Sequence, residues 1–147
     1  MGIVDRAKKV VVIGDVFADM ISKVRGFPET GGRTFGTSFM RNSGGTGGNI
    51  AAGLAVLGME ASIVCGLGDD ENGEFLLEEL KQSGVNTEHV KVTAGLKSGA
   101  VPIMVDEDGE RVIYVLVKGS AFEAIEPEDL LFLEEMNPDA LCFTGVI

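Results

Sequence analysis

Short, uninterrupted runs of apolar residues recur along the chain and predict buried β-strands. Three such runs, at residues 10–13, 61–64 and 140–143, are dominated by apolar side chains and show no alternation of apolar and polar positions. This pattern is typical of parallel strands that are covered on both faces. Residues 49–57 and 74–82 are instead predicted as helices, because apolar side chains recur at helical spacing and a glycine lies just beyond each segment.

Further segments with strand character lie between these core elements. Residues 21–24 and 34–41 are predicted as strands, and residues 98–118 as a hairpin, because an Asp-Gly pair at its tip favours a two-residue type I′ turn. The hairpin arms are apolar on both faces, so we expect other protein segments, from this chain or a second one, to cover each face. Pro102 favours an edge strand or a bulge. We expect these segments to pair into a separate small sheet, called the lid below.

The order of the elements predicts a three-layer, Rossmann-like α/β fold, in which core strands alternate with helices. A last helix is predicted at residues 127–135, where Pro127 suits the first turn. We expect a single domain over residues 1–147. Beyond the third core strand only a short apolar tail follows, ending at Val146-Ile147. The C-terminal half of the fold is therefore expected to be incomplete, either because sequence is missing or because another chain completes the sheet.

Composition and charge narrow the classes of partner. The chain has 147 residues and a formal net charge of −11, and it contains no basic cluster. A chain this acidic repels nucleic acid and anionic membranes, so neither is expected as a partner. No window holds 18 unbroken apolar residues, and the charged start of the chain does not read as a signal peptide. We therefore expect a cytoplasmic protein.

A metal site is not expected. Cys65 and Cys142 lie in apolar runs and read as reduced core thiols, and His89 has no ligand partner at metal spacing. The acidic loop at residues 66–73 could suggest a metal site, but turn formation and helix capping explain its composition better.

The most informative segment is a glycine-rich loop at residues 44–49, which reads G-G-T-G-G-N. The absence of side chains allows a ligand to approach the backbone closely. A helix is expected to follow directly, with its unpaired N–H groups and positive dipole end directed at the loop. This arrangement suits an oxygen-rich molecule such as a polyol or a phosphate ester. The alternative is a tight turn that only caps the helix.

The loop is also part of a longer spaced pattern. A glycine pair, small residues, an asparagine and two later glycines stand at Gly44, Gly45, Gly47, Asn49, Ala51, Gly58 and Gly68. This pattern resembles the first motif of the PfkB, or ribokinase-like, carbohydrate kinases. The segments I-G-D-V-F-A-D and G-L-G-D-D-E-N-G resemble the same family, and the hairpin resembles half of its lid. The resemblance covers essentially the whole chain, but only the N-terminal half of the family's fold.

The resemblance implies roles for individual residues. Asp19 and Asn49 would form hydrogen bonds with sugar hydroxyls, and Gly44 and Gly45 would pass close to the substrate. A carboxylate and a carboxamide supply the acceptors and donors that a polyol needs. Asp19 could instead be a solvated loop acid. Asn49 could cap the helix, a role that is compatible with sugar binding.

Two positions depart from the pattern of ribokinase itself. Phe17 stands where ribokinase has an asparagine, and Thr46 stands where it has a lysine. These departures put ribose in doubt as the substrate. Phe17 would either pack on a sugar face or fill space left by a smaller ligand. Together with Gly145, which follows the strand that would border the sugar, these residues are possible pocket residues.

The family's second motif, D-T-x-G-A-G-D, carries the catalytic base and the anion hole, and it does not occur in this sequence. Nor does the segment that holds the ATP base. We therefore expect no catalytic residue in this chain. The parent enzyme would use ATP and Mg²⁺ to phosphorylate a sugar, whereas neither is expected to bind tightly to this chain alone. The lid strands are expected to form a homodimer interface.

Two other classes of function stay open. One is a non-catalytic sugar-binding or regulatory module that is complete as it stands. The other is a nucleotide-binding Rossmann domain. The second is disfavoured because the first core strand exits without the glycine fingerprint of dinucleotide-binding folds.

Overall fold

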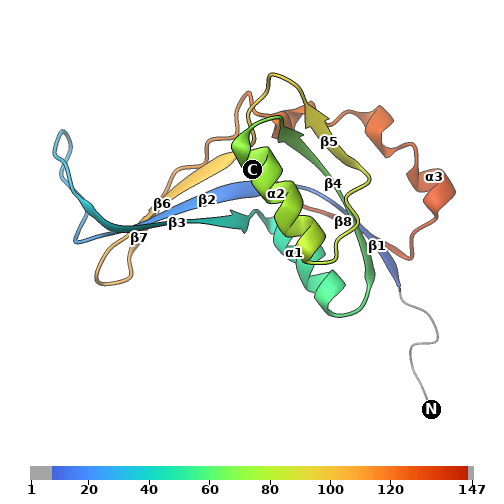
Figure 1. The fold of residues 1–147 in the computed structure, drawn as a ribbon, viewed down its shortest axis with the longest axis horizontal. Helices are drawn as coiled ribbons and strands as arrows, with labels where there is room; N and C mark the ends of the chain where they lie inside the picture. The colour runs from blue at the N-terminus through green and yellow to red at the C-terminus, as the bar shows by residue number, and fades with distance from the viewer. Residues whose placement is uncertain (1–7, 146–147) are drawn as a thin grey trace, which may run out of the picture.

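A parallel four-stranded sheet forms the centre of the molecule (Figure 1). The computed structural model describes residues 8–145, so residues 1–7 and the apolar tail at 146–147 lie outside the described part. The sheet has the order β5-β4-β1-β8 and is parallel throughout. Its members are β1 (Lys9–Ile13), β4 (Glu60–Gly68), β5 (Val90–Thr93) and β8 (Ala140–Phe143).

The three predicted core strands are confirmed, and β5 was missed. Val11, Val12 and Ile63 are fully buried because the centre of the sheet is covered on both faces. By contrast, β5 is an edge strand of four half-exposed or exposed residues, V-K-V-T. A segment this short and this polar carries no apolar run for sequence analysis to detect.

Two helices cover one face of this sheet (Figure 1). They are α1 (Thr46–Val56) and α2 (Glu71–Gln82), and their buried side chains join the core cluster formed by alternate residues of β4. Gly66, on the other face of β4, lies against the backbone of Ala121, so the segment that follows the lid covers that face. The predicted three-layer arrangement is confirmed.

The helix predicted at residues 127–135 is broken into two short pieces. A 3₁₀ turn, Pro127–Leu130, is followed by the single-turn helix α3 (Leu133–Met136). The carboxylate of Asp129 accepts the N–H of Glu126 at 2.8 Å and pairs with Lys91 at 2.7 Å. These contacts hold the first turn in a tight form, so a continuous helix does not develop.

A second four-stranded sheet extends away from the helices, as Figure 1 shows. Its order is β3-β2-β6-β7, and it consists of β2 (Phe17–Val24), β3 (Gly36–Gly44), β6 (Ala100–Val105) and β7 (Arg111–Ile113). β2 is antiparallel to β3 and parallel to β6. The prediction that the inserted strands pair into a separate lid sheet is confirmed, although β2 and β3 are longer than expected.

Two details of the lid hairpin differ from prediction. Asp106 accepts the N–H groups of Asp108 and Glu110 through its side chain, and Gly109 alone has a positive φ, of 84°. A type I′ turn needs two residues with positive φ, so this is the longer loop with a left-handed glycine.

Pro102 lies in the interior strand β6, not at an edge. Its carbonyl still accepts the N–H of Tyr114 at 2.9 Å, and its missing N–H interrupts the ladder between β7 and the bridge that joins Ala100 to Leu116.

Within the part of the chain that the structure describes, no helix is both long and apolar enough to cross a membrane.

Candidate functional site

The glycine-rich loop joins the lid to the helical layer. Strand β3 ends at Gly44, Gly45 is the N-cap residue with φ 87°, and α1 begins at Thr46. The helix therefore starts three residues earlier than predicted. Asn49 lies in its first turn, where its N–H donates to the carbonyl of Gly45 at 3.0 Å. The prediction that Asn49 caps the helix is wrong, while its exposed side chain remains accessible to a ligand.

The open N–H groups expected at the start of α1 are already occupied. Asp15, directly after β1, accepts the N–H of Thr46 at 2.7 Å and that of Gly47 at 3.3 Å through its carboxylate. Its carbonyl accepts the N–H of Gly48 at 3.0 Å. Sequence analysis missed this residue because the contact spans 31 positions in the chain. The helix terminus is therefore satisfied by the protein itself and is not an empty anion site.

The glycines of the loop serve this packing first. A Cβ at Gly45 would lie 2.6 Å from the carbonyl oxygen of Asp15, and one at Gly47 would lie 2.8 Å from it. Any other residue at either position would push the helix away from the exit of β1. Gly44 is different, because a side chain there would collide with the carboxyl group of Asp19. Gly44 is thus the loop glycine that lies against a candidate ligand-binding group.

Asp19 is the least satisfied polar group of the site. It lies on β2 and is half-buried, and no other residue among 8–145 donates a hydrogen bond to its carboxylate. Partial burial raises the pKa of the Asp19 carboxyl above its ordinary value. A half-buried carboxylate without a partner gains free energy when a ligand hydroxyl donates to it. The alternative of a solvated loop acid does not fit, since Asp19 lies within a strand.

Phe17 points to the same face of β2 as Asp19, two residues away. Its side chain is 3% exposed and makes an edge-to-face contact with Phe122, with 5.5 Å between the ring centroids. Gly99 lies so close that a Cβ there would strike the Phe17 ring. Of the two roles considered for Phe17, the geometry favours filling space beneath the site.

The remaining predicted pocket residues lie on either side of Asp15. Thr46 has an exposed side chain, and the contact that it makes with Asp15 uses only its backbone. Gly145 is exposed at the exit of β8 and has open space around it. Its neighbour Thr144 donates its hydroxyl to Asp15 at 2.8 Å. The structure thus brings the glycine loop, Asp19 and the end of β8 into one region.

The acidic loop before α2 has a structural role, as predicted. Asp70 is the N-cap residue of α2 and accepts the N–H of Gly73 at 3.0 Å and the hydroxyl of Ser98 at 2.8 Å. Burial acts to raise the pKa of Asp70, but these hydrogen bonds and the charge of Lys97 outweigh it and lower the pKa. Across residues 8–145, no group of three or more His, Cys, Asp or Glu side chains is placed to hold a metal ion.

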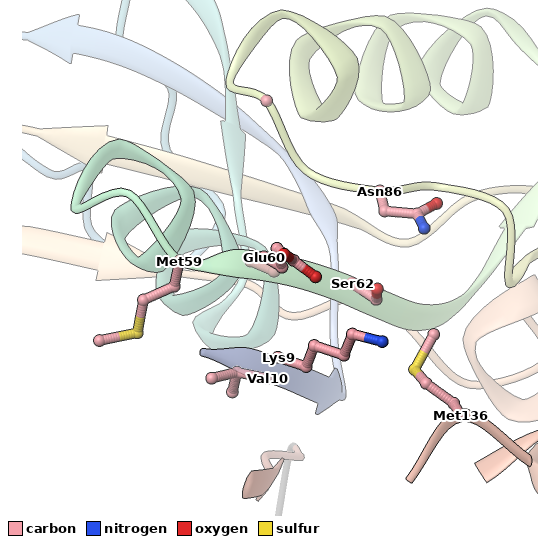
Figure 2. Close-up of a pocket in the computed structure, with 9 residues that line it drawn as sticks. Lys9, Val10, Met59, Glu60, Ser62, Asn86 and Met136 are labelled. Atoms are coloured by element: carbon pink, nitrogen blue, oxygen red, sulfur yellow. The ribbon is translucent and has the colours of Figure 1, made fainter. Parts of the chain in front are cut away.

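A separate cavity of about 450 Å³ lies at the opposite end of the parallel sheet (Figure 2). It is lined by Lys9, Glu60 and Ser62 from the amino-terminal parts of β1 and β4, together with Asn86 and Met136. In open α/β sheets, ligands bind beyond the carboxyl ends of the strands. None of the candidate residues lines this cavity, so it is not the site that the glycine loop forms.

Comparison with known proteins defines the class of this fold and site. The model of the pfkB family of carbohydrate kinases matches residues 7–145. The chain therefore belongs to the pfkB family of carbohydrate kinases. It is 33% identical to the ribokinase of Mus musculus over 126 residues, which is 86% of this chain and 38% of that protein. It is 32% identical to the ATP-dependent ribose-1-phosphate kinase of Halopiger xanaduensis over 137 residues, covering 93% of this chain and 46% of that kinase.

Solved structures lead to the same family. Arabidopsis thaliana ribokinase complexed with ribose and ATP superposes with a TM-score of 0.80 at 26% identity, covering 94% of this chain and 45% of that one. Ribokinase from Giardia lamblia gives a TM-score of 0.80 at 28% identity, with 93% and 42% covered. The chain thus has the ribokinase fold over rather less than half the length of these relatives.

Proposed function

We propose that this chain forms the acceptor-binding part of an ATP-dependent carbohydrate kinase. Asp19, Gly44, Gly45 and Asn49 are proposed to contact the sugar. The observation that carries this proposal is the half-buried carboxylate of Asp19, which has no hydrogen-bond partner among the described residues and lies directly over Gly44. Gly44 leaves this carboxylate accessible, and Asn49 presents its exposed carboxamide one helical turn beyond the loop.

The environment of Asp19 favours a hydroxyl-bearing ligand over an anion. The N–H groups at the start of α1 are taken by Asp15, and Asp19 itself repels a phosphate. Sugar hydroxyls can donate to Asp19 and both donate to and accept from Asn49. Because Phe17 and Thr46 offer no side-chain amide or ammonium, the acceptor is proposed to differ from ribose in its polar contacts.

The motif that carries the family's catalytic base does not occur in this sequence, so this chain is proposed to supply no base for the transfer step. The described residues hold no cluster that fits a cation, and the helix terminus that would suit a phosphate is filled. In the family relatives solved with ATP or ADP, the nucleotide is bound by a chain about twice as long or longer. When bound, ATP supplies the phosphoryl group and Mg²⁺ neutralises its charge. We propose that this chain alone binds neither tightly and does not catalyse the transfer.

The lid is proposed to be a homodimer interface. Phe39, Ile113 and Leu116 are among its large apolar side chains that are exposed to solvent. The strand register places Phe39 and Leu116 on one face of the lid and Ile113 on the other, so within residues 8–145 exposed apolar side chains remain on both faces. A second copy of this lid, packed on the face that carries Phe39 and Leu116, would bury these two side chains in an isologous contact. Sedimentation velocity of the wild-type chain and of a Phe39→Ser, Leu116→Ser variant tests this; a monomeric wild-type chain at micromolar concentration would contradict it.

A cytoplasmic location of the protein is likewise proposed.

Titration calorimetry with D-ribose, D-fructose, other monosaccharides and ATP tests the proposed function. We expect heat of binding with at least one sugar, its loss in Asp19→Ala, and no tight binding of ATP. Asp108→Ala is the matched control, because Asp108 is an exposed acid in the lid turn, at the opposite end of β2 from Gly44. Sugar binding that survives both Asp19→Ala and Asn49→Ala would overturn the site assignment. The chain can also be mixed with a separate C-terminal half that carries the family's second motif. Sugar binding without phosphorylation in that mixture would favour the alternative, a non-catalytic binding module.

A further inference from the structure

Asp15 is a buried carboxylate whose hydrogen-bond partners among residues 8–145 are N–H and O–H donors. It is 3% exposed, and the ion pairs found within residues 8–145 do not include it. Its Oδ2 accepts the N–H of Thr46 at 2.7 Å, while its Oδ1 accepts the hydroxyl of Thr144 at 2.8 Å and the N–H of Gly47 at 3.3 Å. A buried anion that depends on N–H and O–H donors alone is sensitive to the loss of each one.

Three glycines are needed to bring these donors together. A Cβ at Gly14 would collide with the Thr144 hydroxyl, and Cβ atoms at Gly45 and Gly47 would lie within 3 Å of the Asp15 backbone. Glycine weakens a helix when it stands in place of alanine. At Gly47, which lies within α1, the chain therefore gives up local helix stability in order to hold the start of α1 against the ends of β1 and β8.

The Asp15–Thr144 contact lies where the connections of the parallel sheet diverge. From β1 the chain crosses to β4 on one side, while β8 lies on the other side of β1. The carboxyl ends of β1 and β8 therefore flank the point at which open α/β sheets bind ligands. Thr46 and Gly47 lie within the loop, between Gly44 and Asn49. The carboxylate that holds their N–H groups therefore also holds the loop in place.

We propose that Thr144, acting through Asp15, is a positioning residue that holds the glycine loop in the geometry needed for sugar binding. Its hydroxyl orients the carboxylate, and the carboxylate in turn orients the N–H groups of the first turn of α1. The exit of β8 is thereby coupled to the loop, although Thr144 itself does not touch the ligand. This inference rests on the proposed function only for what the loop binds, since the coupling itself does not depend on it.

Amide hydrogen exchange without ligand tests the coupling. In Thr144→Val, which keeps the side-chain shape, exchange at Thr46 and Gly47 should accelerate at least about fivefold relative to Val11 at the centre of the sheet. Thr144→Ser restores the hydroxyl and should stay within about twofold of the wild-type rates. Thr93→Val is the matched control, because its hydroxyl also lies at the end of a parallel strand but makes no hydrogen bond in the described structure.

Unchanged exchange at the loop in Thr144→Val would overturn the inference. So would an equal acceleration at every amide, because that would show only a global loss of stability. Asp15→Asn provides a second variant, because it replaces one of the two acceptor oxygens with an NH₂ donor and should loosen at least one of the same two amides.

Binding of D-ribose and D-fructose, followed by calorimetry, separates this inference from the proposed function. If the wild-type chain binds either sugar, Thr144→Val should weaken binding several-fold while Thr144→Ser and Thr93→Val do not. Equal affinities in all four proteins would overturn the positioning role. If the wild-type chain binds no sugar, the proposed function fails, and the exchange rates alone decide the coupling.

Discussion

Truncation of Asp15 to alanine should be among the most damaging single substitutions in this chain. It would leave the N–H of Gly47 buried without an acceptor, at a cost of about 1–3 kcal/mol. The N–H of Thr46 and the hydroxyl of Thr144 are partly buried and would each lose about 0.5–1.5 kcal/mol. The total is about 2–6 kcal/mol, a large share of the roughly 5–15 kcal/mol that stabilises a typical domain.

Urea unfolding followed by circular dichroism measures this loss as a lower midpoint at unchanged slope. Asp108→Ala is the control, because Asp108 is an exposed acid in the lid turn, where a substitution should change stability by at most about 0.5 kcal/mol. If Asp15→Ala costs less than about 1 kcal/mol, the carboxylate does not stabilise the start of α1, and the account of the glycine loop is wrong.

Three further predictions follow from the same geometry. Gly45→Ala should cost more than Gly58→Ala, by about 1–3 kcal/mol in urea unfolding, because both have positive φ but only Gly45 lies against another backbone segment; equal costs would contradict this. Asp70→Ala should cost about 0.5–2 kcal/mol near neutral pH through loss of the α2 cap. Since the folded pKa of Asp70 is lowered, this stabilisation is present above the ordinary value of 3.8 and is lost as pH falls through the folded pKa, so a pH-independent difference would count against it. Burial raises the pKa of Cys65 to about 12, so this thiol should not react with iodoacetamide at pH 8 until the chain unfolds, as mass spectrometry of quenched samples would show.

The parallel sheet could be predicted because its signal is local and continuous. Residues 10–13 and 61–64 carry their burial in their own composition, and glycines mark the ends of both helices. β5 escaped detection because an edge strand is stabilised by one neighbour and needs few apolar residues. The break between Pro127–Leu130 and α3 escaped for a different reason, since it depends on contacts of Asp129 that include a distant lysine.

The sequence predicts where the candidate site lies, but not the hydrogen bonds that hold its loop in place. The spacing of Gly44, Gly45 and Asn49 points to the start of a helix next to a ligand. Nothing local to Asp15 shows that its carboxylate fills the helix terminus, because the two segments meet only in the folded chain. The helix N–H groups that were expected to be open are therefore satisfied by an internal cap, and Asp19 is the carboxylate of the candidate site that has no donor among the described residues.

The central claim, that sugar binds over Gly44 beside Asp19, is tested most directly by titrating the isotopically labelled chain with D-ribose, D-fructose and related sugars in two-dimensional NMR. The account predicts that the amide signals of Asp19, Gly44, Gly45 and Asn49 shift together with a single saturating dependence on the concentration of the sugar that binds. Shifts confined to the cavity at the opposite end of the sheet, around Lys9, Glu60 and Asn86, would contradict it.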